Sequence, residues 1–228
     1  MKKNIALVLS SGGARGFAHI GAIKMLERQG YNITSVAGAS MGALVGGIYA
    51  SGLLPQFEEW ATTIDKMEVL RLTDVTLSSR GLVKGKKIIE KLKEIVPDRN
   101  IEDLRIPFCA VATDILKGKE KVFTSGDLYD AIRASISIPT IFQPFQIGED
   151  FYVDGGLVNP VPINRIKRNE NDLLVIVNVN ADIPPEPKKE PEEKPADNKY
   201  LKKIRSIQAK LSKETPGNNK SSIGLLSL

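Results

Sequence analysis

The chain has 228 residues, of which 42% are hydrophobic and 26% charged, a balance typical of a globular protein with a sizeable core. The net charge of +5 divides into +2 over residues 1–180 and +3 over the remainder, which argues against a nucleic-acid-binding face. One cysteine and one histidine exclude an intramolecular disulfide framework and nearly exclude a zinc site of Cys and His ligands.

The N-terminal sequence MKKNIALVLSSGGA resembles a signal peptide. Its apolar core, IALVL, is shorter than the roughly 7–15 residues of a signal sequence, so a first buried strand over 5–10 explains it better. No apolar run approaches the ~20 residues that span a membrane. These features indicate a cytoplasmic protein, either soluble or peripheral at the inner face of the membrane.

The first fifty residues predict a parallel α/β sheet. They alternate between short apolar runs and helical spacing, with Gly30 placed to end the first helix. Further along, KGKKIIEKLKEIV is the clearest helix of a mostly helical region, and Asp127 is placed to cap a later one. The predicted elements are strands at 5–10, 35–40, 106–116, 120–125 and, as a late buried strand, 172–180; helices at 18–30, 41–52, within 53–105 and at 127–137; and an ordered apolar loop at 137–145.

The composition changes beyond residue 180. We therefore expect a catalytic domain over 1–180 and a proline-rich, charged linker or lid over 181–200. A basic helical segment is expected over 201–228, where the final residues SSIGLLSL resemble a helix that is cut short. Its stretch 201–213 has apolar residues at helical spacing, which fits either contact with an anionic membrane or an ordinary packing helix.

The motif GASMG, residues 38–42, fits the pattern G-x-S-x-G between a strand and a helix. In such a turn the serine hydroxyl is exposed at the carboxyl end of the sheet, and the glycines allow strand and helix to approach closely. Ser40 is thus a candidate nucleophile between Gly38 and Gly42. The motif alone leaves open an ordinary strand-to-helix turn with small residues.

A base for Ser40 is expected to be a carboxylate. His19 is the only histidine, precedes the serine and has apolar neighbours, which favours a structural role. Asp154 ends an apolar run and is followed by Gly155 and Gly156, so the backbone can pass close to another element. The same Asp-Gly pair is also typical of a hairpin turn, although the prolines that follow disfavour a second strand there.

The loop SSGGARG, residues 10–16, follows a strand and opens a helix, so its backbone N–H groups form an anion cradle. It lacks the dinucleotide fingerprint and the Walker sequence, which makes nucleotide binding the least favoured interpretation. Arg15 near a helix N-terminus opposes the helix dipole and suggests an anionic neighbour or a buried ion pair.

In their order along the chain, the cradle at 11–16, GASMG at 38–42 and DGG at 154–156 closely resemble the bacterial patatin-like phospholipase family. The resemblance extends to FAHIGAI, PFCAVATDI and DAIRASISIPTIFQPF, and it covers roughly residues 5–180. It implies a three-layer α/β/α sandwich with a mostly parallel central sheet. It also implies a lipid acyl hydrolase that uses a Ser-Asp dyad and needs neither metal nor cofactor.

By this resemblance Ser40 is the nucleophile and Asp154 the general base. The oxyanion hole would comprise the N–H groups of Gly12, Gly13 and Ala14, with Arg15 supporting the loop and Gly16 completing the motif. Ser11 stands where the family usually has glycine, so the exact shape of the hole is in question there. Burial would have to favour proton transfer to Asp154, because an aspartate of reference pKa ~3.9 is a weak base for a serine hydroxyl.

The expected substrates are fatty-acyl esters of phospholipids, lysophospholipids or related lipids, cleaved through an acyl-enzyme. A non-catalytic lipid- or acyl-binding module that uses the same pocket is the alternative. The loop 137–145 could line an acyl pocket or simply pack in the core. Peripheral membrane contact is a further expectation, whereas the oligomeric state is not indicated.

Overall fold

A mixed sheet forms the centre of the protein. The computed structural model describes residues 3–64 and 85–182. Apart from residues 181 and 182, the predicted linker and basic segment lie outside these residues. The strands of the described residues are β1 (Lys3–Leu9), β2 (Tyr31–Ala39), β3 (Phe108–Asp114), β4 (Lys119–Phe123), β5 (Phe145–Ile147), β6 (Asp150–Asp154) and β7 (Leu173–Val177).

The sheet has a parallel part and an antiparallel part. Strands β7, β1, β2 and β3 lie side by side and are parallel, whereas β4, β5 and β6 join through antiparallel pairs. Strand β4 pairs with β3 over Ala110–Asp114. The other edge of β3 is therefore shared by β2, which pairs as far as Val111, and by β6, which pairs from Ala112 on.

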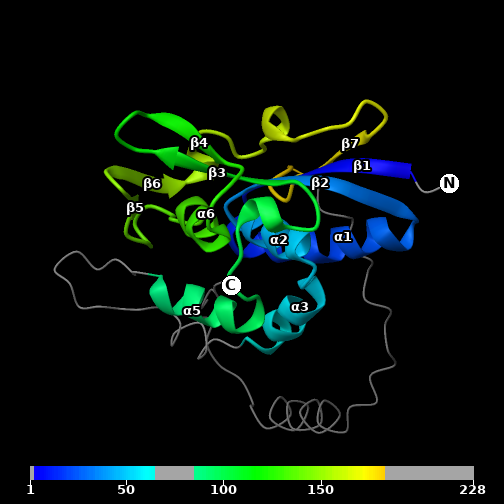
Figure 1. Ribbon diagram of the computed structural model, residues 1–228, viewed down its shortest axis with the longest axis horizontal. Coiled ribbons are helices and arrows are strands. Elements are labelled where there is room, and N and C mark those ends of the chain that lie inside the picture. Colours follow the sequence, from blue (N-terminus) through cyan, green and yellow to red (C-terminus); the bar gives the residue numbers. More distant parts are fainter. Residues whose placement is uncertain (1–2, 65–84, 183–228) are drawn as a thin grey trace, which may run out of the picture. The chain divides into compact units, whose positions relative to one another are not determined.

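Helices cover one face of the sheet. Figure 1 shows α1, α2 and α6 along this face, with α3 and α5 beyond them. The helix α2 is buried along nearly its whole length, because it packs against the sheet on one side and against other helices on the others. The described α-helices are α1 (Ala18–Arg28), α2 (Met41–Ser51), α3 (Leu54–Thr63), α5 (Lys86–Ile95) and α6 (Leu128–Ser135), and the short 3-10 turns are η1 (Gly13–Phe17), η2 (Ile101–Asp103), η3 (Gly155–Leu157) and η4 (Ile163–Arg165).

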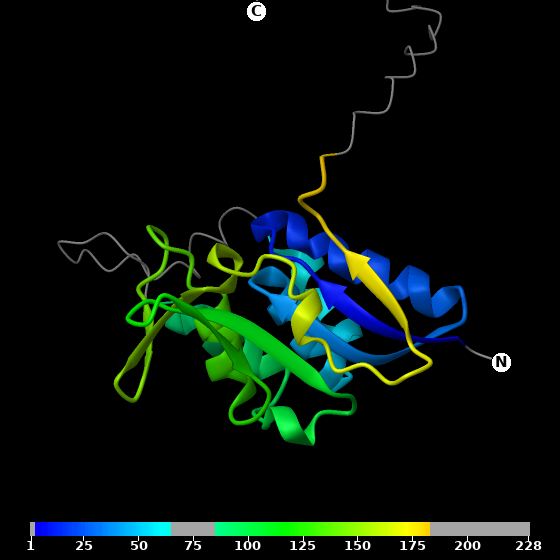
Figure 2. The same ribbon diagram turned by 90° about the horizontal axis from the view of Figure 1, so that it is seen from above.

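The opposite face is crossed by the segment between β6 and β7 (Figure 2). Its contacts with the strands include hydrogen bonds from the Cys109 thiol to the Arg165 carbonyl, at 3.3 Å, and from the Ser35 hydroxyl to the Lys167 carbonyl. Among the described residues the third layer therefore consists of this segment and its 3-10 turns. The predicted α/β architecture, with parallel strands flanked by helices, is confirmed.

The predicted alternation of the first fifty residues is confirmed, and glycines end both helices. After α1, Gly30 has the positive φ of 82°, and Gly52 after α2 has a φ of 87°. Asp127 caps α6 as predicted, because its carboxylate accepts the N–H of Asp130 at 2.8 Å. The apolar stretch 137–145 is a loop that leads into β5, also as predicted.

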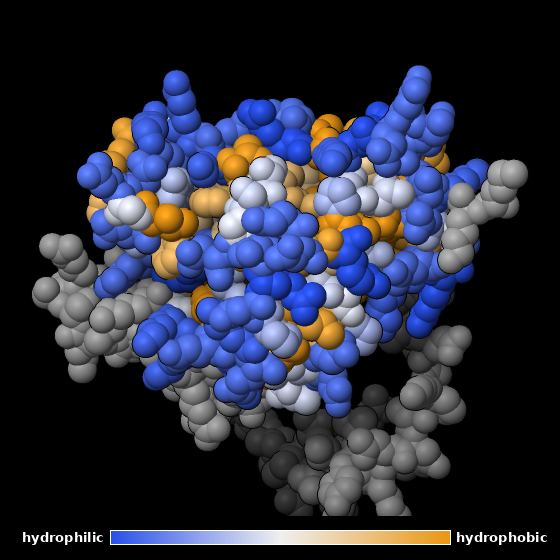
Figure 3. All heavy atoms as spheres, viewed as in Figure 1, coloured by the Kyte–Doolittle hydropathy of each residue, from blue (hydrophilic) through white to orange (hydrophobic). Residues whose placement is uncertain are grey.

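The prediction of a late buried strand is wrong. Strand β7 lies at the edge of the sheet beside β1 (Figure 2), and the side chains of Leu173 and Ile176 are 48% and 42% exposed. An apolar run does not distinguish a central strand from an edge strand, because neighbours that lie far away in the sequence decide its burial. Figure 3 shows that hydrophobic residues at the surface of one face lie mainly over the sheet.

The Asp-Gly pair at 154–155 is not a hairpin turn. The hairpin of this region joins β5 to β6 and turns around Gly148, whose φ is 61°. Asp154 ends β6, and the chain continues into η3. No helix of the described residues is long and apolar enough to cross a membrane.

Candidate active site

Ser40 stands on a sharp turn between β2 and α2. Its backbone angles, φ 54° and ψ −125°, are strained for a residue with a side chain. Glycine is required at both flanking positions, because neighbouring backbone passes too close to leave room for a side chain. A Cβ on Gly38 would lie 2.4 Å from the Gly42 carbonyl carbon, and one on Gly42 would lie 2.3 Å from the Leu9 carbonyl oxygen. The motif GASMG thus forms the strained strand-to-helix turn that its pattern predicts.

Ser40 and Asp154 are in direct contact. The Ser40 hydroxyl donates a hydrogen bond of 2.5 Å to Asp154 Oδ2, while Asp154 Oδ1 accepts the N–H of Gly156 at 2.7 Å. Both side chains are buried, with 3% and 6% of their surface exposed. Burial raises the pKa of the Asp154 carboxyl, and the hydrogen bonds from Ser40 and Gly156 oppose part of this rise.

The geometry of the sheet explains how residues 114 positions apart meet. Strands β2 and β6 approach each other end to end along the same edge of β3. The last residue of β2 pairs with Val111, and Asp154 pairs with the next residue, Ala112. Ser40 follows β2 directly, so the two side chains are held at the junction of the two strands.

His19 takes no part in this contact. It is fully buried, and its Nε2 makes a 2.9 Å hydrogen bond with the Ser10 carbonyl. Burial lowers the pKa of its imidazole, which favours the neutral ring. This contact with Ser10, just before the glycine-rich loop, agrees with the structural role predicted for His19.

The glycine-rich loop 11–16 presents free backbone donors beside Ser40. Among the described residues, the N–H groups of Gly12, Gly13 and Ala14 have no hydrogen-bond acceptor, whereas the Arg15 N–H donates to the Gly12 carbonyl at 3.1 Å. Gly13 and Ser40 line the same cavity. Gly16 lets η1 approach the start of α2, since a Cβ there would lie 2.2 Å from the Met41 side chain.

Arg15 and Ser11 were the two open questions of this loop. Arg15 is exposed and forms no ion pair with another described residue, which rules out a buried ion pair, one of the two interpretations of its position. The Ser11 side chain packs against Gly156, and the missing side chain of that glycine leaves room for it. A Cβ on Gly156 would lie only 2.9 Å from Ser11 Cβ. The Ser11 N–H also donates to the Pro160 carbonyl at 2.8 Å, which ties the glycine-rich loop to the chain that follows η3.

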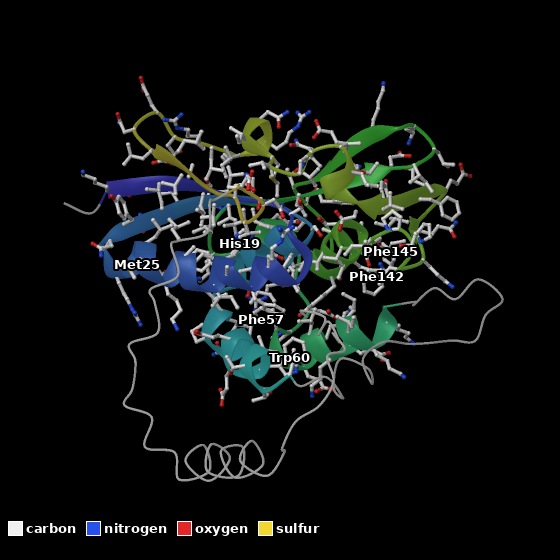
Figure 4. All side chains as sticks on the ribbon, turned by 180° about the vertical axis from the view of Figure 1, so that it is seen from behind. His19, Met25, Phe57, Trp60, Phe142 and Phe145 are labelled. Atoms are coloured by element: carbon white, nitrogen blue, oxygen red, sulfur yellow. The ribbon has the colours of Figure 1, made fainter. Side chains whose placement is uncertain are left out.

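An apolar cavity of about 530 Å³ opens beside Ser40. This volume lies within the ~300–1,000 Å³ of small-molecule sites. Among the described residues that line it, Ser40 alone bears a hydroxyl or a charge; the others include Phe57 and Trp60 on α3, Ile88 and Leu92 on α5, and Ile138 and Phe142 from the loop 137–145. Figure 4 shows Phe57 and Trp60 on α3, away from the sheet, and Phe142 near the end of α6.

Sequence reasoning missed the contributions of α3 and α5 to the cavity. Their apolar positions are typical of ordinary amphipathic helices, and nothing in the spacing indicates a shared cavity. Ser135, at the end of α6, was also missed, although its hydroxyl contacts the Ser40 backbone. A small polar residue in the apolar stretch DAIRASISIP is the one signal that could have drawn attention to it.

The fold and the site together define an α/β protein whose buried serine–aspartate pair borders an apolar cavity. The chain belongs to the patatin-like phospholipase family, whose model matches residues 7–165. An uncharacterized NTE family protein of Mycobacterium tuberculosis is 44% identical over 177 residues, which are 78% of this chain and 49% of that protein.

More distant relatives include the neuropathy target esterase of Drosophila persimilis. It is 35% identical over 166 residues, which are 70% of this chain and 12% of that protein. Among solved structures, VipD from Legionella pneumophila matches with a TM-score of 0.46 and 15% identity, over 77% of this chain and 49% of that one. The chain therefore spans about half the length of the mycobacterial relative that it matches.

Proposed function

We propose that this protein hydrolyses fatty-acyl esters through a Ser40–Asp154 dyad. The observation that carries the proposal is the 2.5 Å hydrogen bond from the Ser40 hydroxyl to a buried carboxylate, at the border of an apolar cavity. Family membership supports an acyl hydrolase of the phospholipase and esterase class. The name of the Drosophila relative, an esterase, agrees with this class.

The first step is attack by Ser40. Its hydroxyl proton passes along the existing hydrogen bond to Asp154 Oδ2 while its oxygen forms a bond to the ester carbonyl carbon. A carboxylate in water is a weak base for this proton. Burial raises the pKa of Asp154 and so moves its basicity toward the range that general-base catalysis needs.

The negative charge that develops on the carbonyl oxygen needs donors. The backbone N–H groups of Gly12, Gly13 and Ala14 suit this role, because no described residue accepts their hydrogen bonds. The N–H of Ser40 itself is engaged by Ser135, and that of Arg15 by the Gly12 carbonyl, so neither contributes. One well-placed donor is worth about 10²–10³ in rate in other enzymes.

The second half of the reaction releases the products. The protonated Asp154 gives its proton to the departing alcohol oxygen as the ester bond breaks, which leaves an acyl group on Ser40. Asp154 then takes a proton from a water molecule, whose oxygen attacks the acyl carbon. The proton returns to the Ser40 oxygen as the fatty acid leaves.

The apolar lining of the cavity favours an aliphatic acyl chain as the transferred group. Its walls offer hydrocarbon and aromatic side chains, and burying a methylene group there contributes about 0.8 kcal/mol. The described lining residues offer no counter-charge to a charged headgroup, so we expect the headgroup to remain outside.

Activity-based labelling tests the proposal. The purified protein is expected to react with a fluorophosphonate at Ser40 and to hydrolyse p-nitrophenyl esters of fatty acids. Ser40→Ala should abolish both activities. Asp154→Asn should reduce both strongly, because the hydroxyl proton then has no acceptor of suitable basicity.

Ser51→Ala is a matched control. Ser51 is a buried serine at the opposite end of α2, and its hydroxyl donates to the Ile48 carbonyl at 2.6 Å. This variant should be labelled like the wild type. Folded wild-type protein that resists labelling and cleaves no ester would overturn the proposal; lipid binding that Ser40→Ala leaves unchanged would then favour the non-catalytic alternative.

A further inference from the structure

The C-terminal end of α6 contacts both members of the serine–aspartate pair. The Ser135 hydroxyl accepts the backbone N–H of Ser40 at 2.8 Å and donates to the Val111 carbonyl at 2.6 Å. Two residues further on, the Ser137 carbonyl accepts the N–H of Asp154 at 3.0 Å. Ser135 is fully buried, so water does not compete for these bonds.

The contact with Ser40 falls on the most strained backbone of the site. Ser40 has a positive φ, which a residue with a side chain adopts only when its surroundings hold it there. Ser40 is buried, and its N–H bonds to a side chain of the α6 end. The Ser135 hydroxyl satisfies that donor, and without it the N–H would lack a partner in the interior.

Val111 on β3 provides a common anchor for both members of the pair. Its carbonyl accepts the Ser135 hydroxyl, which holds Ser40. The same carbonyl lies against Gly155, where a Cβ would come within 1.9 Å of the oxygen. Since Gly155 directly follows Asp154, the positions of nucleophile and carboxylate are both set relative to one atom of the sheet.

The end of α6 is itself held firmly. The buried Arg133 guanidinium donates to the Ser137 hydroxyl at 2.5 Å and lies 5.2 Å from the centre of the Phe142 ring. The Ser137 hydroxyl donates back to the Arg133 carbonyl at 2.6 Å. These bonds order the turn of chain that carries Ser135, so its hydroxyl has a defined direction.

We propose that Ser135 is a positioning residue for the reaction. It holds the Ser40 backbone so that the hydroxyl stays aligned with Asp154, and it exchanges no proton with the substrate. This inference rests on the proposed function, because alignment has a measurable effect only if Ser40 reacts. A displacement of about 1 Å in such a site lowers the rate by about 10²-fold.

The test compares steady-state kinetics on a p-nitrophenyl ester for wild type, Ser135→Ala and Ser135→Thr. Ser135→Ala is expected to lower kcat about 10²-fold with KM unchanged within about twofold. Ser135→Thr keeps the hydroxyl and is expected to recover most of that loss. The pH at which kcat is half-maximal should rise in Ser135→Ala, because misalignment weakens the hydrogen bond from Ser40 that lowers the pKa of Asp154.

Ser51→Ala separates positioning from stability. It removes another buried hydroxyl that donates to a backbone carbonyl, but at the other end of α2. Its kcat should equal that of the wild type. This should hold even if thermal melts show that Ser51→Ala and Ser135→Ala lose a similar amount of stability. If Ser135→Thr fails to fold, the comparison of the two alanine variants decides the question.

Several results would overturn the proposal. These include a wild-type kcat in Ser135→Ala, a loss that appears only in KM, and a half-maximal pH that falls, because loss of the hydrogen bond from Ser40 can only raise the pKa of Asp154. A loss no larger than that of Ser51→Ala at equal folded fraction also contradicts it. A wild type that shows neither labelling nor turnover would instead overturn the proposed function, so the two failures are distinguishable.

Discussion

The turn around Ser40 and the wall of the cavity beside it are built in opposite ways. At the turn, backbone meets backbone: Gly38, Gly42 and Gly155 each lie where a Cβ would come within 2.4 Å of a neighbouring main-chain atom. The described residues of the cavity wall contribute mostly apolar side chains, from η1, α2, α3, α5 and the chain that follows α6. A backbone contact cannot adjust to an added atom, whereas a side-chain wall changes its volume gradually. We therefore expect changes at the turn to abolish activity and changes at the wall to shift substrate preference.

The largest effect is expected for Gly155→Ala. Its Cβ would lie 1.9 Å from the Val111 carbonyl oxygen, and the central strand β3 cannot move away. We expect a loss of about 3–5 kcal/mol in the free energy of unfolding together with loss of activity. Chemical denaturation and ester hydrolysis measure the two effects.

Gly21→Ala is the control for that substitution. Gly21 lies in α1, and a Cβ there meets nothing within 4 Å. Because alanine is the better helix former, this variant should gain about 0.5–1 kcal/mol with unchanged activity. Equal stability in the two alanine variants would contradict the close backbone contact at Gly155.

Asp154→Asn should lower activity and raise stability. The pKa of Asp154 is raised in the folded protein, so folding is favoured below the unfolded pKa and that stability is lost as pH rises through the folded pKa. At neutral pH the buried charge therefore costs stability, and the neutral amide removes this cost. A gain of about 0.5–2 kcal/mol in a thermal melt is expected, with kcat lower by about 10³-fold or more. A less stable Asp154→Asn protein would contradict the raised pKa.

The pH dependence of kcat should report the same carboxylate. Asp154 must be ionised to accept the Ser40 proton, so kcat should fall about tenfold per pH unit below its pKa. Since burial raises that pKa, the decline should begin at a higher pH than the ordinary aspartate value of ~3.9 allows. Measured on protein that circular dichroism shows to be folded, a flat profile down to about pH 4 would argue against Asp154 as the base.

The smallest effect on catalysis is expected at the cavity wall. Ile88→Phe should reduce the cavity volume and lower kcat/KM for long-chain esters about tenfold relative to butyrate esters. Ile89→Phe is the matched control, because Ile89 is the next residue of α5 and lies outside this cavity. An identical chain-length profile in both variants would show that the acyl chain does not enter the cavity.

Local patterns in the sequence were enough to predict much of the fold. The run IALVL, the capping Asp127 and the glycines after α1 and α2 act through contacts within a few residues, so the sequence carries their signals directly. The burial of β7 was predicted wrongly, because strand pairings between distant parts of the chain decide whether a strand lies at an edge. The surroundings of Arg15 and the contact of Ser135 with Ser40 have no local signature either. Arg15 is exposed, although a buried ion pair was one of two interpretations, and the role of Ser135 was missed.

The sequence by itself determined that Ser40 would stand on a tight strand-to-helix turn, since only glycines at 38 and 42 permit that backbone. It also singled out Asp154 as the candidate partner. Only the tertiary structure decided that the two would touch, because β2 and β6 must meet end to end along one edge of β3. That meeting depends on strand pairings between distant parts of the chain, and no short stretch of sequence encodes such pairings. The cavity beside Ser40 arises in the same way, from helices that share no motif and converge only when the chain folds.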